Sequence, residues 1–341
     1  MRPMNYVAGV AAALCASVMS ITGALAEEPV RGGEATFLMS PAPQVLTSAM
    51  TTAGAEQVVS AKISDSLFTY DFNLNPQPLL AESYEVSDDG LRVTFHLRKG
   101  VKWHDGVEFT SEDLAYTTME VWKVLHGRGR TIFANVESVE TPDKHTAVFV
   151  MRRPSPGMLK SLAAQYAQIL PAHIYKGTDP LTNPANLKPI GTGPFRFVSF
   201  QPGDNLVLER NPDYWDDKLI FRFIPDPATR AAALESGDAH IVPQNLIPMA
   251  DLERLEASGE FDVTTKGYEF LNEMEMIEFN LDDDVMKDIR VRKAIAHAID
   301  RQWIVDNILF GYGQPATTPL HHQLTELHDD TGVPQYEYDP E

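Results

Sequence analysis

Apolar and polar residues alternate strictly over residues 91–98, and this pattern constrains the fold more than any other feature of the sequence. A period of two places every second side chain on one face, as in a β-strand that is buried on one side. Asp89-Gly90 directly before the pattern is typical of a hairpin turn. The apolar positions are Leu91, Val93, Phe95 and Leu97. We therefore predict a half-buried strand here, entered from a tight turn.

Strand signals of this kind mix with helix signals along the chain. Gln201-Pro202-Gly203-Asp204 separates two strand-like segments and predicts a second hairpin. Asp226 followed by Pro227 predicts a helix start, and Gly237 predicts its end. Further expected strands are 33–38, 135–141, 145–151 and 219–224, and further expected helices are 55–67, 291–299 and 303–310. The mixture predicts an α/β or α+β fold, and 341 residues exceed what one core usually spans, so we expect two lobes.

The first 26 residues are typical of a secretory signal peptide. Arg2 gives a basic start, a short apolar stretch follows over 7–18, and a small-x-small site ends at Ala26. We predict cleavage after Ala26, a periplasmic mature protein and no stable membrane insertion after cleavage. An uncleaved anchor is disfavoured because Ser, Thr and Gly residues dilute the apolar stretch. A lipoprotein anchored through Cys15 is disfavoured because the bulky Leu14 precedes it.

Charge and cysteine content exclude several kinds of protein. The formal net charge is −20, and removal of residues 1–26 takes away one positive charge and leaves −21. So acidic a surface argues against nucleic acid and anionic lipid as partners. Cys15 is the single cysteine and lies in the signal segment, so disulfides, thiolate catalysis and cysteine-ligated metal are excluded for the mature chain.

No catalytic, phosphate-binding or metal motif stands out. Gly191-Thr192-Gly193-Pro194 is glycine-rich, but no Lys-Ser/Thr follows and Pro194 lacks an amide hydrogen, so a turn at a strand start is the better interpretation. Trp103-His104-Asp105-Gly106 contains a His-Asp pair, but Asp-Gly is first a tight turn. His321-His322 is a weak metal-ligand pattern. We therefore expect no catalytic residues, no metal site and no cofactor.

Three groups of segments, taken together, resemble the family 5 extracellular solute-binding proteins, the oligopeptide-, dipeptide- and nickel-binding receptors of ABC importers. They cover nearly all of residues 30–341, and the first is highly specific for the family. The first group runs from Leu79 to Gly90 and on through Phe95–Gly106 to Thr110–Leu114. The second is Gly191–Phe195 with Glu209–Trp215. The third is Phe279-Asn280 with Asp288–Ile295 and Ala298–Arg301.

The resemblance implies an α/β, two-lobed clamp of the type II periplasmic-binding-protein kind, with an extra subdomain in lobe I. Residues 27–75 and 188–267 would build the lobe I sheet, 76–187 the inserted subdomain, and 268–341 the start of lobe II, with a strand near 268–280 crossing the hinge. Family members normally continue for well over a hundred residues. Since Asp339 at the end also looks like a helix cap, we expect a C-terminally truncated sequence with lobe II incomplete.

The implied activity is capture of peptides in the periplasm and delivery to the permease subunits of an ABC importer, by a monomer that is not an enzyme. Two lobes closing over a ligand supply the mechanism. Candidate ligand-binding residues follow from topology alone. They are Met39 and Ser40 at the end of the first strand, Gln165 and Tyr166 in the inserted subdomain, and Phe270 and Asn272 on the crossing strand.

Three alternatives stay open at this point. The same receptor could take a nickel chelate, haem, an opine or an oligosaccharide. A secreted hydrolase could use His104 and nearby carboxylates. A sensory partner could pass the bound state to a chemoreceptor.

Overall fold

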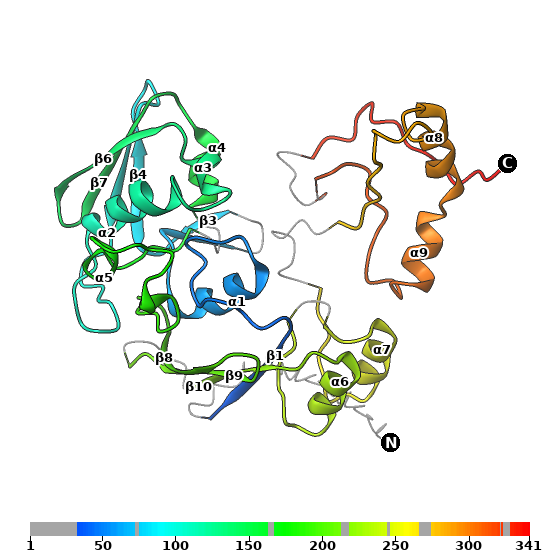
Figure 1. Cartoon of the computed structure of the whole chain (residues 1–341), viewed down its shortest axis with the longest axis horizontal. Helices are drawn as coiled ribbons and strands as arrows, with labels where there is room; N and C mark the ends of the chain where they lie inside the picture. Colours follow the sequence, from blue (N-terminus) through cyan, green and yellow to red (C-terminus); the bar gives the residue numbers. More distant parts are fainter. Residues whose placement is uncertain are drawn as a thin grey trace, which may run out of the picture. The chain divides into compact units, whose positions relative to one another are not determined.

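The computed structural model describes residues 33–71, 75–162, 167–212, 218–243, 246–265, 274–320, 322 and 328–341 (Figure 1). The predicted signal peptide, residues 1–26, lies outside these ranges. Within them, no helix is long and apolar enough to cross a membrane.

A four-stranded sheet joins the start of the chain to residues far along it. Its strands are β1 (Ala35–Met39), β8 (Phe195–Gln201), β9 (Asn205–Arg210) and β10 (Lys218–Phe223), in the order β1-β10-β9-β8. β1 runs parallel to β10, and the other two pairs are antiparallel, so the expected hairpin around 201–204 is confirmed. Helix α1 (Gly54–Ile63) packs on this sheet through Val59 and Ile63, which share a core with Leu208 and Phe221.

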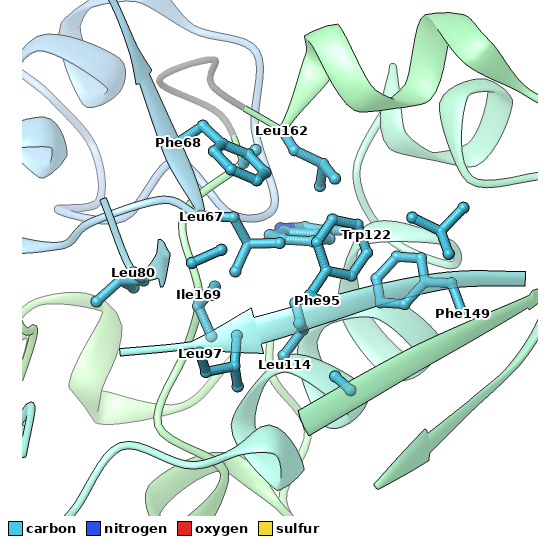
Figure 2. Close-up of a cluster of buried hydrophobic side chains, with 14 of the residues drawn as sticks. Leu67, Phe68, Leu80, Phe95, Leu97, Leu114, Trp122, Phe149, Leu162 and Ile169 are labelled. Carbon is cyan, nitrogen blue, oxygen red and sulfur yellow. The ribbon is translucent and has the colours of Figure 1, made fainter. Parts of the chain in front are cut away.

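A second four-stranded sheet lies wholly within residues 81–151. Its strands are β4 (Ala81–Val86), β5 (Arg92–Leu97), β6 (Val136–Asp143) and β7 (Thr146–Met151), antiparallel throughout in the order β4-β5-β7-β6. The predicted strand at 91–98 is β5, and its alternate residues Val93, Phe95 and Leu97 are buried. Figure 2 shows Phe95 and Leu97 in a core that also contains Trp122 and Phe149.

Short elements surround this second sheet. Strands β2 (Phe68–Tyr70) and β3 (Pro76–Pro78) form a small antiparallel pair. The helices are α2 (Ser111–Tyr116), which continues as the π-helix η1 (Thr117–Trp122), α3 (Gly129–Ile132), α4 (Pro156–Ser161), α5 (Ala172–Tyr175) and the 3₁₀ turn η2 (Pro184–Asn186). Thr110 caps α2, because the side chains of Thr110 and Asp113 form a capping box.

In the described residues after the first sheet, the helices are α6 (Pro227–Glu235), α7 (Met249–Ala257), α8 (Ile289–Ala298) and α9 (Arg301–Asn307). The predicted cap of α6 is confirmed, since the Asp226 carboxylate accepts a hydrogen bond from Thr229 N at 2.8 Å and Gly237 adopts φ +77°. α8 has no buried residue.

Two of the expected helices were too long, and one expected strand is not seen in the described residues. The helix expected over 55–67 ends at Ile63, because the Ile63 carbonyl accepts a hydrogen bond from Gly193 N at 2.9 Å instead of continuing the helix. The helix expected to reach residue 310 ends at Asn307, since Phe310 has φ +50° and Gly311 N bonds back to Val305 O. The described part of the crossing segment, 274–280, is not in a strand, and residues 266–273 lie outside the described ranges.

Candidate functional site

A cavity of about 380 Å³ lies at the carboxyl end of β1 and the amino end of α1. In open α/β sheets, ligands bind outside the carboxyl ends of the strands, so this is the expected place for a site. Apolar and polar groups share its walls in nearly equal measure. The lining residues are Met39, Ser40, Pro41, Ala42, Gln44, Thr51, Ala53, Gly54, Ala55, Glu56, Val58, Pro243 and Leu246.

Two of the predicted ligand-binding residues, Met39 and Ser40, therefore line a cavity. Met39 is buried and Ser40 is half-buried. The other four, Gln165, Tyr166, Phe270 and Asn272, lie outside the described residues. All six stay predictions as ligand contacts.

The cavity wall at residues 51–53 is held from two sides. Gln57 of α1 donates from Nε2 to Thr52 O at 2.8 Å. His126 contacts Thr51 O through Nε2 at 3.0 Å, while its Nδ1 accepts a hydrogen bond from Gly129 N at 2.9 Å. Because Nδ1 accepts, Nε2 carries the proton and donates. Burial lowers the pKa of His126, which keeps the ring neutral and suited to this pair of bonds.

Sequence reasoning missed Gln44, Thr51 and Glu56 as cavity residues. Glu56 is 5 % exposed, and its Oε1 accepts a hydrogen bond from Gln44 N at 2.8 Å. An acidic residue in the first turn of a helix, after the loop that leaves a strand end, is the sequence signal that could have pointed to Glu56.

The glycine-rich segment 191–193 forms a close junction with the end of α1. A Cβ on Gly191 would lie 1.8 Å from Ile63 O, and one on Gly193 would lie 2.8 Å from the same atom. Only glycine permits this approach, and Gly193 N uses it to bond Ile63 O at 2.9 Å. The segment directly precedes β8, so the predicted turn at a strand start is confirmed.

His104 and Asn211 also contact this junction. His104 accepts a hydrogen bond from Gly191 N at Nδ1 (3.2 Å) and contacts Gly193 O through Nε2 at 2.9 Å. Asn211 donates from Nδ2 to Gly193 O at 3.0 Å. The backbone of 191–193 thus links His104 and Asn211, which lie far apart in the sequence.

This arrangement leaves His104 no nitrogen for acid–base work, because both are engaged by backbone groups. Burial lowers its pKa, against a smaller opposing effect of the bond to Gly193 O. A general base must reach the proton that it removes. The hydrolase alternative therefore lacks its proposed base in this conformation.

Asp113 is a second junction. Its carboxylate accepts hydrogen bonds from Thr110 N and Ala172 N, both at 2.8 Å, and from Trp103 Nε1 at 3.3 Å. Burial raises its pKa, and these hydrogen bonds oppose the rise. The neighbouring Asp105 pairs instead with His173 Nε2 at 2.8 Å. Trp103, Asp105 and Asp113 thus make structural contacts beside the second sheet.

Among the described residues, no three His, Cys, Asp or Glu side chains gather in a way that could hold a metal ion. Of the predicted weak pair, His321 lies outside the described residues, and His322 contacts Gln314.

Comparison with known proteins finds related proteins over most of the chain. The model of the bacterial extracellular solute-binding proteins of family 5 matches residues 75–341. The oligopeptide-binding protein AppA of Bacillus subtilis is 29 % identical over 324 residues, which are 92 % of this chain and 58 % of AppA. Its structure in complex with a nonapeptide superposes with a TM-score of 0.78 at 28 % identity, covering 92 % of this chain and 63 % of that one.

Other relatives carry different ligands in their names. The dipeptide-binding protein of Escherichia coli is 29 % identical over 296 residues, which are 77 % of this chain and 53 % of that protein. Heme-binding protein A of Haemophilus influenzae is 30 % identical over 292 residues, 78 % of this chain and 52 % of that protein. The chain spans about half the length of the curated relatives that it matches.

Proposed function

The chain belongs to the bacterial extracellular solute-binding proteins of family 5, and we propose that it captures peptides in the periplasm and delivers them to the permease subunits of an ABC importer. Relatives named for oligopeptide and dipeptide binding support the ligand class. The observation that carries the proposal is the cavity at the carboxyl end of β1, where Met39 and Ser40 lie beside the first turn of α1.

The proposed mechanism is closure of a two-lobed clamp over the ligand, which the membrane partner then recognises. Residues 27–75 and 188–267 form the lobe I sheet, 76–187 the inserted subdomain and 268–341 the start of lobe II. Gln165, Tyr166, Phe270 and Asn272 join Met39 and Ser40 as ligand contacts. The observed pairing of β1 with β10, and a second sheet confined to 81–151, support this division.

The proposed setting is the periplasm, reached through a signal peptide cleaved after Ala26. The receptor acts as a monomer and binds without turning over its ligand. The backbone pairing of both His104 nitrogens supports a receptor over the secreted hydrolase.

Native mass spectrometry of the purified chain tests the ligand class. We expect a bound mass, or a distribution of masses, that fragments into peptides. A bound mass equal to haem or to a nickel chelate would overturn peptide capture and favour the receptor role suggested by the haem-binding relative.

A further inference from the structure

The cavity at β1 and α1 contains one charged side chain among its lining residues, Glu56. The remaining walls are apolar or neutral, with Met39, Val58 and Leu246 as the larger apolar side chains. No lysine, arginine or histidine of the described residues lines it. The electrostatic character of the cavity is therefore set by one carboxylate.

Only one of the two carboxylate oxygens of Glu56 accepts a hydrogen bond from the described residues. Glu56 is 5 % exposed, and its Oε1 accepts a hydrogen bond from Gln44 N at 2.8 Å. Oε2 accepts no hydrogen bond from the part of the chain that the structure describes. A carboxylate oxygen that lines a cavity and has no donor from the chain can accept a hydrogen bond from a ligand. Oε2 thus lacks a donor in a place where a ligand could provide one.

A role in capping α1 does not account for this geometry. Glu56 is the third residue of α1, where a glutamate commonly bonds the backbone N–H of the cap residue. Here the cap residue is Ala53, and its N–H donates to Thr51 Oγ1 at 3.2 Å. The charge still suits the helix dipole. However, the Glu56 carboxylate accepts its hydrogen bond from Gln44 N, and Gln44 also lines the cavity. It does not bond the start of the helix.

We infer that Glu56 binds a primary ammonium group of the ligand through Oε2, which makes it a specificity-determining residue of the cavity. This rests on the proposed function, because it names the part of a peptide that enters the cavity. An ammonium group carries three donors and a compact positive charge, which match a carboxylate oxygen in an otherwise uncharged cavity. The apolar walls accommodate the carbon atoms next to the nitrogen.

Two parts of a peptide carry this group, the amino terminus and the lysine side chain. Isothermal titration calorimetry on the full chain separates them with trialanine, N-acetyl-trialanine and N-acetyl-Ala-Lys-Ala. We expect the wild-type chain to bind at least one of the two ammonium-bearing peptides about tenfold or more tightly than N-acetyl-trialanine. The tighter of the two identifies which ammonium group enters the cavity. This comparison needs no variant, so it holds even if a substitution prevents folding.

Glu56→Gln tests the residue itself, since glutamine keeps an oxygen for Gln44 N and removes the charge. We expect it to abolish the tenfold preference for an ammonium-bearing peptide over N-acetyl-trialanine. Glu253→Gln is the matched control, because it removes the same charge from the exposed face of α7, outside the cavity. It should retain the preference.

The outcomes separate the two proposals. A wild-type chain that binds all three peptides equally, or a Glu56→Gln chain that keeps the preference, overturns the ammonium site and leaves peptide capture standing. A wild-type chain that binds none of the three overturns peptide capture, and the ammonium site with it.

Discussion

Single residues explain why the sequence motifs of this chain have their composition. The backbone of 191–193 passes so close to the end of α1 that glycine is required, and His104 and Asn211 then bond that backbone. The histidine in the Trp-His-Asp-Gly motif is thus a connector between two parts of the chain. Its sequence neighbourhood resembles a catalytic pair, but its contacts are structural.

Gly191→Ala should destabilise the chain by about 1–3 kcal/mol or prevent folding, because the added methyl group would lie 1.8 Å from Ile63 O. Urea unfolding followed by tryptophan fluorescence measures the change. Gly157→Ala is the control, since a Cβ there meets nothing within 4 Å and Gly157 lies in α4. Equal stability of the two variants would contradict the close-packed junction.

The two buried histidines, His104 and His126, should make stability depend on pH. Burial lowers the pKa of both below the ordinary 6.5, so the unfolded chain binds protons there before the folded chain does. The free energy of unfolding is therefore expected to fall as the pH drops from about 6.5 towards the lowered pKa values, by at most about 1.4 kcal/mol per pH unit for each histidine.

Urea midpoints of the wild type, His104→Gln, His126→Gln and the double variant, measured between about pH 5 and about pH 8, test this dependence. Each single variant should have a shallower pH dependence than the wild type, and the double variant the shallowest. A double variant that loses stability with acid as steeply as the wild type would contradict the assignment.

At the scale of elements, the sequence predicted what is local and missed what depends on distant partners. β5 and the hairpin of β8 and β9 followed from alternation and turn residues, and the start of α6 followed from Asp226 and Pro227. The early end of α1 could not be predicted, because the group that ends it comes from Gly193. The parallel pairing of β1 with β10 joins residues near 35 to residues near 219, and no local pattern encodes it.

The cavity illustrates the same limit. Met39 and Ser40 were predicted from the position of the first strand, whereas Glu56, Thr51 and Leu246 come together only through tertiary structure. The sequence identifies a strand end as a place for a ligand, but it cannot determine which loop faces that end.

Asp113→Ala should destabilise the helix start at α2 and the contacts around it. The substitution leaves the buried donors of Thr110 N, Ala172 N and Trp103 Nε1 without their acceptor, which should cost about 2 kcal/mol or more. Thermal unfolding measures the loss. Asp113→Asn retains one carbonyl oxygen and should lose less. If the alanine variant melts at the wild-type temperature, Asp113 does not have this structural role.

At the scale of the whole molecule, the two sheets are well packed, and the described part of residues 274–341 is not. Phe95 and Phe221 are fully buried in the two sheets, whereas Ile289, Trp303 and Ile308 in the later segment are 53–56 % exposed. Few buried apolar contacts imply a low free energy of local opening.

Brief digestion with trypsin should therefore cut first within 287–301, after Lys287, Arg290, Arg292, Lys293 or Arg301. Mass spectrometry of the first fragments locates the cuts. Arg92 and Arg98 on and after β5 are the internal control, since their side chains are 47–48 % exposed but their strand is paired on both sides. First cuts at those two residues would contradict the difference in local stability.

The central claim is that this chain is a peptide receptor, and a thermal melt with and without a pool of di- to pentapeptides tests it most directly. Intrinsic tryptophan fluorescence follows the unfolding of the chain. A ligand present at about a hundred times its Kd should add about 2.7 kcal/mol to the free energy of unfolding. We expect a cooperative melt whose midpoint rises with peptides. A cooperative melt with the same midpoint in both conditions would contradict peptide capture by this chain.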